Sequence, residues 1–115
     1  MAVFEKSPPE LVARFDAIAG RFAVAQRRQM FGYPALFVGG NLATGLFSGS
    51  WMIRLGVADL AALMALPGAA PFSPMPGRAM TGYATLPADV VADDAELEAW
   101  VGRSISFAAA LPAKR

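Results

Sequence analysis

The sequence predicts a two-layer α+β domain, in which an antiparallel sheet of four to five strands packs against flanking helices in the order α-β-β-β-β-α-β-α. Three observations carry this prediction. Apolar residues recur at helical spacing near both ends of the chain, short apolar runs fill the part between, and glycine-containing turns separate those runs. With 115 residues, the chain is expected to form a single domain over residues 1–115, with a core from about residue 8 to 110.

A first helix is expected over about residues 8–20, before the strands begin. Apolar residues recur at spacings of four, three and four between Leu11 and Phe22, which is typical of one buried helical face. Ser7 stands before two prolines and three residues ahead of Glu10. This pattern predicts that the Ser7 side chain caps the helix.

Short apolar segments bounded by turn residues follow, and each is predicted to be a strand. Glycine and asparagine, which tolerate positive φ, mark the turns between them. Loops this short join only antiparallel strands. The four expected strands are residues 25–31, 33–38, 42–47 and 51–55.

The second half of the chain is expected to add a helix over residues 57–66, a proline-rich loop over 67–78 and a last strand over 79–86. Asp93 followed by Glu96 forms a capping box, which predicts the start of a final helix. The two tryptophans lie on apolar faces and are expected in the core.

Charged residues are scarce in the middle of the chain, because residues 29–88 carry only Arg54, Asp59 and Arg78. A small domain normally has a charged surface, so part of this segment is expected to be covered. The helices should cover one face of the sheet and leave the other free. The apolar character of that free face predicts that a second copy covers it, which makes the protein a homodimer.

The residue types present exclude most catalytic sites. The sequence has no Cys and no His, and therefore lacks the commonest general base and the usual transition-metal ligands. Helix capping and the helix dipole explain the acidic residues from Asp93 to Glu98. No glycine-rich phosphate loop precedes a helix. We therefore expect no enzyme activity, no cofactor and no metal site.

Membrane and nucleic-acid roles are also disfavoured. Residues 29–53 are uncharged, but repeated Gly, Pro and Asn residues break this stretch into strand-length pieces, so no membrane span is expected. The first ten residues lack the apolar segment of a signal peptide, which predicts a cytoplasmic location. A net charge of +1 and an acidic last helix argue against direct DNA association.

An ordered set of motifs resembles the N-terminal domain of the TfoX/Sxy family of competence regulators. Residues 28–33 read R-Q-M-F-G-Y and resemble the family signature R-x-M-F-G-(G/Y), although Tyr33 replaces the common second glycine. Similar segments continue along the chain to about residue 110. They are Phe37–Asn41, Trp51–Leu55, Pro71-Phe72, Met75–Met80 with Tyr83, and Leu86-Pro87 followed by Asp93, Leu97 and Trp100.

The resemblance implies a fold similar to that of secretion chaperones, which often dimerise through the sheet or an edge. Competence regulators of full length carry a second, C-terminal helical domain. This chain stops at Arg115, directly after the last expected helix, so it is expected to be a stand-alone N-terminal domain. The family also implies a regulatory role.

Two arginines are the best candidates for a binding site, because Arg54 and Arg78 are the only cations in the apolar middle of the chain. If both point to one face, they can grip an anionic ligand. The alternative is that each pairs with a carboxylate such as Asp59, or with backbone carbonyls.

Further candidates each have a structural alternative. Arg28 forms a basic pair with Arg27 that either contacts phosphate or guards an exposed strand edge, and a lone pair favours the edge. The loop around Met75 is either a recognition loop or a crossover that covers a sheet edge. Tyr33 and Tyr83 either offer hydroxyls to a ligand or, more commonly, pack their rings.

Two functions stay open at this point. The first is a non-enzymatic interaction or regulatory module, a homodimer that binds another protein through its sheet and the loop around Met75. The second is a domain that binds an anionic small molecule between the sheet and the last helix, using Arg54, Arg78 and Tyr83. A buried concavity holding both arginines favours the small molecule, whereas an apolar sheet face favours the interaction module.

Overall fold

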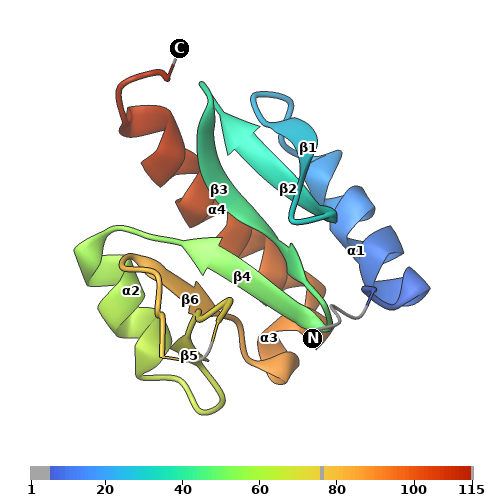
Figure 1. Ribbon diagram of the computed structural model, residues 1–115, viewed down its shortest axis with the longest axis vertical. Helices are drawn as coiled ribbons and strands as arrows, with labels where there is room; N and C mark the ends of the chain where they lie inside the picture. Colours follow the sequence, from blue (N-terminus) through green and yellow to red (C-terminus); the bar gives the residue numbers. More distant parts are fainter. Residues whose placement is uncertain (1–5, 76, 115) are drawn as a thin grey trace.

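Six strands form one antiparallel sheet in the order β1-β2-β3-β4-β6-β5, and the long helix α4 crosses behind its central strands (Figure 1). The structure, a computed structural model, describes residues 6–75 and 77–114. Its elements in chain order are α1 (Pro9–Ala19), β1 (Gln26–Met30), β2 (Tyr33–Val38), β3 (Asn41–Phe47), β4 (Ser50–Arg54), α2 (Val57–Met64), β5 (Ala70–Pro71), β6 (Tyr83–Thr85), α3 (Ala88–Ala92) and α4 (Asp94–Ala110).

The predicted α+β class is confirmed, but the segment between α2 and α4 differs from expectation. The two-residue strand β5 lies where a loop was predicted, and it raises the strand count to six. The last strand, β6, spans three residues rather than eight, and the short helix α3 was not predicted. Strands of two or three residues are too short to show a periodic pattern, so their pairing with distant strands creates them.

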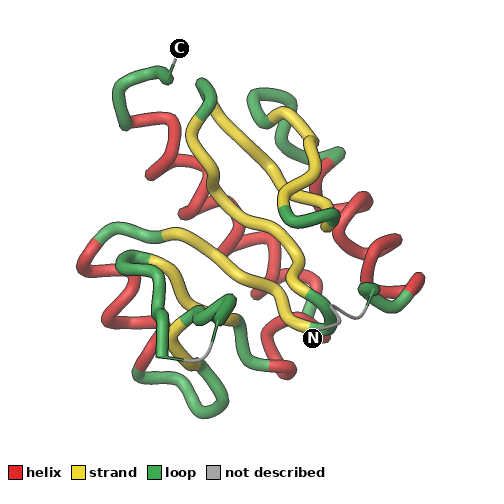
Figure 2. The backbone as a smooth tube through the Cα atoms, viewed as in Figure 1, coloured by secondary structure: helices red, strands yellow, loops and turns green. Residues whose placement is uncertain are grey.

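The helices bury their apolar side chains in one core, on a single side of the sheet. Phe15 of α1, Leu63 of α2, Val90 of α3 and Val101 of α4 all belong to this core. Leu36, Trp51 and Ile53 are among the sheet residues that meet them. Figure 2 shows the helices behind and beside the strands. The side of the sheet away from α4 therefore has no helix over it in the part of the chain that the structure describes.

The starts of the first and last helices are stabilised differently. Asp93 caps α4 as expected, since its carboxylate accepts a hydrogen bond from the Glu96 backbone N–H at 3.1 Å. The predicted Ser7 cap on α1 is wrong. The Ser7 hydroxyl donates instead to the carbonyl oxygen of Ser48 at 2.6 Å, so a turn far away in the sequence competes for it. Helix α1 begins at Pro9 without a side-chain cap.

Trp51 and Trp100 both lie in the core, as predicted, with 2% and 6% of their surface exposed. The centroid of the Trp51 ring is 5.1 Å from that of Phe15. Its Nε1–H donates to Thr44 Oγ1 at 2.9 Å, and the Thr44 hydroxyl donates to the Met52 carbonyl oxygen at 2.6 Å. Because these groups are buried, Thr44 satisfies an indole N–H that water cannot reach.

Replacing Thr44 with valine tests this buried hydrogen bond. Thr44→Val keeps the shape of the side chain but leaves the Trp51 N–H without an acceptor, so the free energy of unfolding should fall by about 1–3 kcal/mol. Chemical denaturation measures the loss. Thr85→Val is the matched control, since its hydroxyl bonds the Ala70 carbonyl oxygen at 3.3 Å on the accessible edge of the sheet. An equal loss in both variants would contradict the special role of Thr44.

Candidate interaction surface

The side of the sheet opposite α4, called the second face from here on, is apolar and partly covered. Four buried side chains form its centre, and five partly buried ones surround them. The buried residues are Ala35, Leu42, Met52 and Phe72, and the surrounding ones are Met30, Phe37, Phe47, Met80 and Tyr83. Phe72 comes from the loop between β5 and β6, and its ring contacts Phe47 edge-on at 5.5 Å. The expectation of a free face is therefore wrong in part, because this loop covers one end of it.

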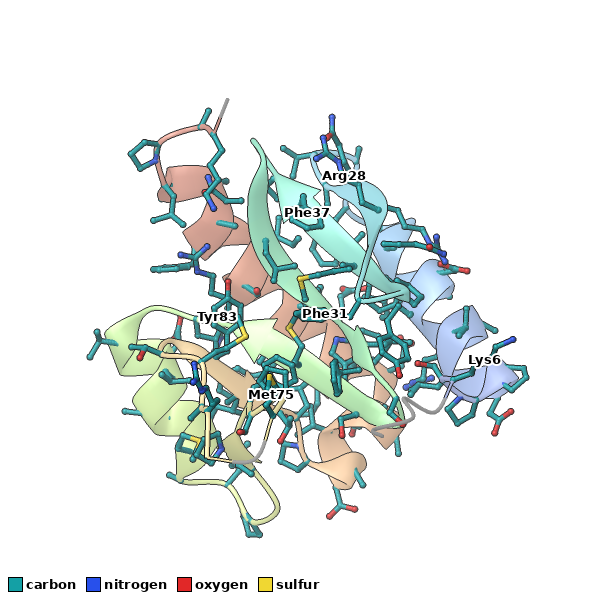
Figure 3. The ribbon with its side chains drawn as sticks, in the orientation of Figure 1. Lys6, Arg28, Phe31, Phe37, Met75 and Tyr83 are labelled. Carbon is teal, nitrogen blue, oxygen red and sulfur yellow. The ribbon has the colours of Figure 1, made fainter. Side chains whose placement is uncertain are left out.

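Two large apolar side chains at this face remain open to solvent. Phe31 is 57% exposed and Met75 is 58% exposed, and Figure 3 shows both in front of the sheet, on the side away from α4. Phe31 lies at the tip of the β1–β2 hairpin, where its ring meets Phe47 edge-on at 5.8 Å. Met75 lies on the covering loop and forms an isolated bridge with Arg78. The second face thus carries exposed apolar groups on both the hairpin and the loop.

Phe31 has a backbone conformation that suits phenylalanine poorly. Phe31 and Gly32 form the two-residue turn between Met30 and Tyr33, with φ angles of 57° and 82°. Such turns favour Asn or Gly at the first position, because a bulky residue at positive φ is strained. Our prediction placed Phe31 inside the first strand, which is wrong. Gly32 was the available signal for the turn, since glycine typically fills its second position.

Arg27 and Arg28 lie on β1, the edge strand of the sheet, and point to opposite faces. Arg27 Nε is 2.6 Å from Asp16 Oδ1 of α1, on the helix side. The Arg28 guanidinium lies 5.5 Å from the centroid of the Phe37 ring on the second face, and its Nη2–H donates to Gln26 Oε1 at 3.0 Å. The pair does not form one basic patch, and its position matches the strand-edge interpretation.

Arg54 is half-buried between two aromatic rings. Its guanidinium carbon is 5.5 Å from the Tyr83 ring centroid and 5.6 Å from that of Phe107. Nη1–H also makes a long hydrogen bond, 3.4 Å, to the Leu42 carbonyl oxygen. Asp59, the carboxylate considered as its partner, instead lies 3.6 Å from Arg103. Arg54 is thus held mainly by cation–π contacts.

Arg78 does not join Arg54 in a common pocket. It is exposed on the loop between β5 and β6, where its backbone N–H donates to the Met75 carbonyl oxygen at 3.0 Å. Neither arginine lines any of four well-formed cavities in the described part of the chain. The predicted concavity that would hold both arginines is therefore not among these cavities.

The two tyrosines differ in their surroundings. Tyr33 is buried, and its ring centroid is 5.2 Å from that of Phe47. Tyr83 is partly buried on the second face. Burial raises the pKa of the Tyr83 hydroxyl above its ordinary value, and the positive charge of Arg54 opposes this rise. Both rings pack against neighbours, as the structural alternative proposed.

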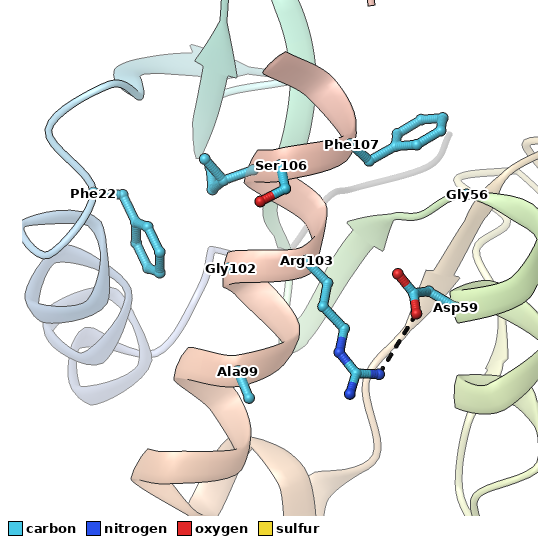
Figure 4. A pocket seen from close by; sticks show the side chains of 9 residues that line it. Phe22, Gly56, Asp59, Ala99, Gly102, Arg103, Ser106 and Phe107 are labelled. Atoms are coloured by element: carbon cyan, nitrogen blue, oxygen red, sulfur yellow. Dashed lines mark ion pairs between the residues drawn. The ribbon is translucent and has the colours of Figure 1, made fainter. Parts of the chain in front are cut away.

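A wide groove of about 640 Å³ lies on the other side of the molecule, along the outer surface of α4. Figure 4 shows Phe22 on one side of it, Asp59 on the other and Gly102 between them. The one ion pair that crosses it joins Arg103 to Asp59. These two charges pair with each other across the groove, so the second face, with its exposed apolar side chains, is the stronger candidate.

The acidic start of α4 is occupied by structural contacts. Arg21 lies 2.9 Å from an Asp94 oxygen and 2.7 Å from a Glu98 oxygen. The hydrogen bond from Arg21 lowers the pKa of the Asp94 carboxyl. Within residues 6–75 and 77–114, no three Asp or Glu side chains group closely enough to hold a metal ion. None of the helices in that same part of the chain is long and apolar enough to cross a membrane.

Replacing Phe31 with asparagine separates the strain in the turn from the packing of the ring. Phe31→Asn gives the favoured Asn-Gly turn and loses only a half-exposed ring, so the stability should stay the same or rise by up to ~1 kcal/mol. Thermal and chemical unfolding measure the change. Gly32→Ala is the control, because a side chain there has open space but meets a φ of 82°, and it should cost about 1 kcal/mol. A loss above ~1 kcal/mol in Phe31→Asn would show that the fold needs the ring.

Removing the Arg54 charge should shift the titration of Tyr83. Arg54→Gln removes the positive charge that opposes the effect of burial on the pKa of Tyr83, so this pKa should rise further. A raised folded-state pKa means that Tyr83 contributes stability below pH 10.0, which is lost as the pH rises through the folded pKa. The ultraviolet absorbance of the phenolate, recorded in a Tyr33→Phe background, reports this pKa. Arg28→Gln is the control and should leave it unchanged; an unchanged value in Arg54→Gln would mean that Arg54 does not lie against Tyr83.

Comparison with known protein families identifies the chain. The family model described as the TfoX N-terminal domain matches residues 16–108. This match covers the whole sheet and α4 up to residue 108, and it confirms the resemblance that the motifs from Arg28 onward suggested. No curated protein and no solved structure matches the chain, so the expected likeness to secretion chaperones stays a prediction. The chain belongs to the TfoX N-terminal domain family.

Proposed function

We propose that this chain is a non-enzymatic interaction module that binds another protein through its second face. One observation carries the proposal: Phe31 is exposed by 57% and held at a φ of 57°. A bulky residue in such a conformation costs stability, and residues held in this way gather at functional sites.

The rest of the second face suits a protein partner. Met75 is as exposed as Phe31, and Met30 and Met80 are only partly buried beside the aromatic rings. Methionine side chains are flexible and polarizable, so they adapt to the shape of a partner. Aromatic and methionine side chains are also enriched at protein interfaces. The combination provides a rigid aromatic anchor within an adaptable apolar surface.

The alternative of an anionic small-molecule site has weaker support. It requires Arg54 and Arg78 to converge, but Arg54 lies between Tyr83 and Phe107 while Arg78 is exposed on the loop. Small-molecule sites are concave and enclose most of their ligand. Arg54 instead borders an apolar face, and Arg78 lies on the loop that covers part of it.

The remaining parts of the proposal rest on the sequence and the family. The lack of His and Cys supports a non-enzymatic role. Membership of the TfoX N-terminal domain family supports a regulatory role like that of competence regulators, and a cytoplasmic location belongs to the same proposal. The expected homodimer stays a prediction, which light scattering across a dilution series tests.

Site-specific photocrosslinking tests the proposed surface in the host cell. A photoreactive amino acid at position 31 or 75 should give the same discrete crosslinked protein, because both positions border the second face. The control positions are Val24, just before β1, and Val57, the first residue of α2, which are 61% and 90% exposed and do not belong to the residues that form the second face. Mass spectrometry identifies the crosslinked chain, and binding is then measured with the purified protein.

Two results would contradict the proposal. The first is crosslinking at Val24 and Val57 that equals crosslinking at positions 31 and 75. The second is a purified crosslinked protein that binds Phe31→Asn as tightly as it binds the wild type, since truncation of an aromatic anchor usually costs ~2 kcal/mol or more.

A further inference from the structure

The arginines of the second face lack a carboxylate partner, whereas three arginines on the helix side have one. Arg21, Arg27 and Arg103 each form an ion pair with a carboxylate of α1, α2 or α4. Arg14 of α1, also on the helix side, donates instead to the Val91 carbonyl oxygen. Arg28 and Arg54 lie over aromatic rings instead, and neither they nor Arg78 form an ion pair with any residue the structure describes.

This difference follows from where the acidic residues lie in the chain. Residues 17–58 and 60–88, which hold all six strands, contain no Asp or Glu. The strands and the covering loop therefore provide cations and apolar side chains to the second face but no anion. Three positive charges around an apolar surface attract a partner of opposite charge, and this attraction raises the association rate and the specificity.

We propose that the second face binds an acidic, apolar peptide segment of another protein. The apolar side chains of that segment pack against Phe31 and Met75, and its carboxylates pair with Arg28 and Arg78 at either side. Arg54, held against Tyr83, contributes positive charge between them. This inference rests on the proposed function and specifies the chemistry of the partner.

A second copy of this chain is a poorer occupant. A symmetric face-to-face dimer places the same surface on both sides. The Arg28, Arg54 and Arg78 side chains of both copies would then enter one interface that has no carboxylate from either strand layer. Like charges brought together in this way oppose association.

A nucleic acid is also a poorer occupant. Binding to single strands relies on aromatic rings with open faces, on which successive bases stack. The Arg28 guanidinium already lies over the Phe37 ring, and Phe47 is held edge-on between Phe31 and Phe72. Only Phe31 among these rings is largely exposed.

Selection from a displayed library of random short peptides tests the inference on the full chain. Peptides selected by the wild-type protein should be enriched in Asp and Glu beside Phe, Leu, Ile and Trp, relative to the starting library. A synthetic selected peptide should bind Arg28→Gln/Arg78→Gln about tenfold more weakly than the wild type. Its affinity should also fall with rising salt.

A matched double variant controls for net charge. Arg27→Gln/Arg103→Gln removes two exposed arginines from the helix side and should bind the same peptide like the wild type. Selection repeated on Arg28→Glu/Arg78→Glu should lose its acidic preference, because the charge of the face is reversed. Circular dichroism of each variant confirms that it is folded.

The outcomes separate the two proposals. Selected peptides that need Phe31 but show no acidic enrichment would overturn this inference and leave the proposed function standing. Peptides that bind Phe31→Asn as well as the wild type would overturn both. Tight binding of a single-stranded oligonucleotide that is lost in Arg28→Gln/Arg78→Gln would assign the face to nucleic acid. A doubled solution mass that Phe31→Asn returns to the monomer would assign it to a second copy.

Discussion

The sheet of this protein is apolar on both faces, whereas its helices cover only one. Packing Trp51, Leu36 and Ile53 against α1 and α4 gives the core that stabilises the fold. The same strands, through the alternation of side chains, also direct Ala35, Met52 and Phe47 to the opposite side. No further helix lies over that side among the described residues, so the chain must cover it by other means or leave it to a partner.

The chain covers part of the second face with the loop between β5 and β6. Phe72 enters the face from this loop, and the Phe72 N–H bonds the Tyr83 carbonyl oxygen at 3.3 Å, which ties the loop to β6. Pairing of β5 with β6 fixes where the loop starts. This cover ends short of the β1–β2 hairpin, where Phe31 remains exposed. The exposed part of the face is therefore the part that the loop does not cover.

The two sides of the molecule also differ in their charged residues. The acidic residues of the described chain lie in or beside the helices, and three of the helix-side arginines pair with them. The strands provide arginines alone, and two of these, Arg28 and Arg54, lie over aromatic rings. A cation over a ring gains only part of what a carboxylate would give it, so these arginines keep a capacity for an anionic partner.

The sequence alone determined the features that depend on neighbouring residues. The period of the apolar residues predicted α1 and α4, the Asp93 cap followed from a local motif, and glycine-containing turns separated β2, β3 and β4. The family resemblance was also visible from ordered motifs, and the family model confirms it.

Only the tertiary structure decided the features that join distant parts of the chain. Ser7 bonds to the turn at Ser48, β5 exists because β6 lies beside it, and Phe107 of α4 becomes a neighbour of Arg54. The candidate residues Arg28, Arg54, Met75, Arg78 and Tyr83 were recognised by type, but their common face was not, and Phe31 was assigned to a strand. A spacing pattern records which side of its own element a residue occupies. Which element then packs against that side is decided by long-range contacts, and here those contacts leave one apolar face partly open.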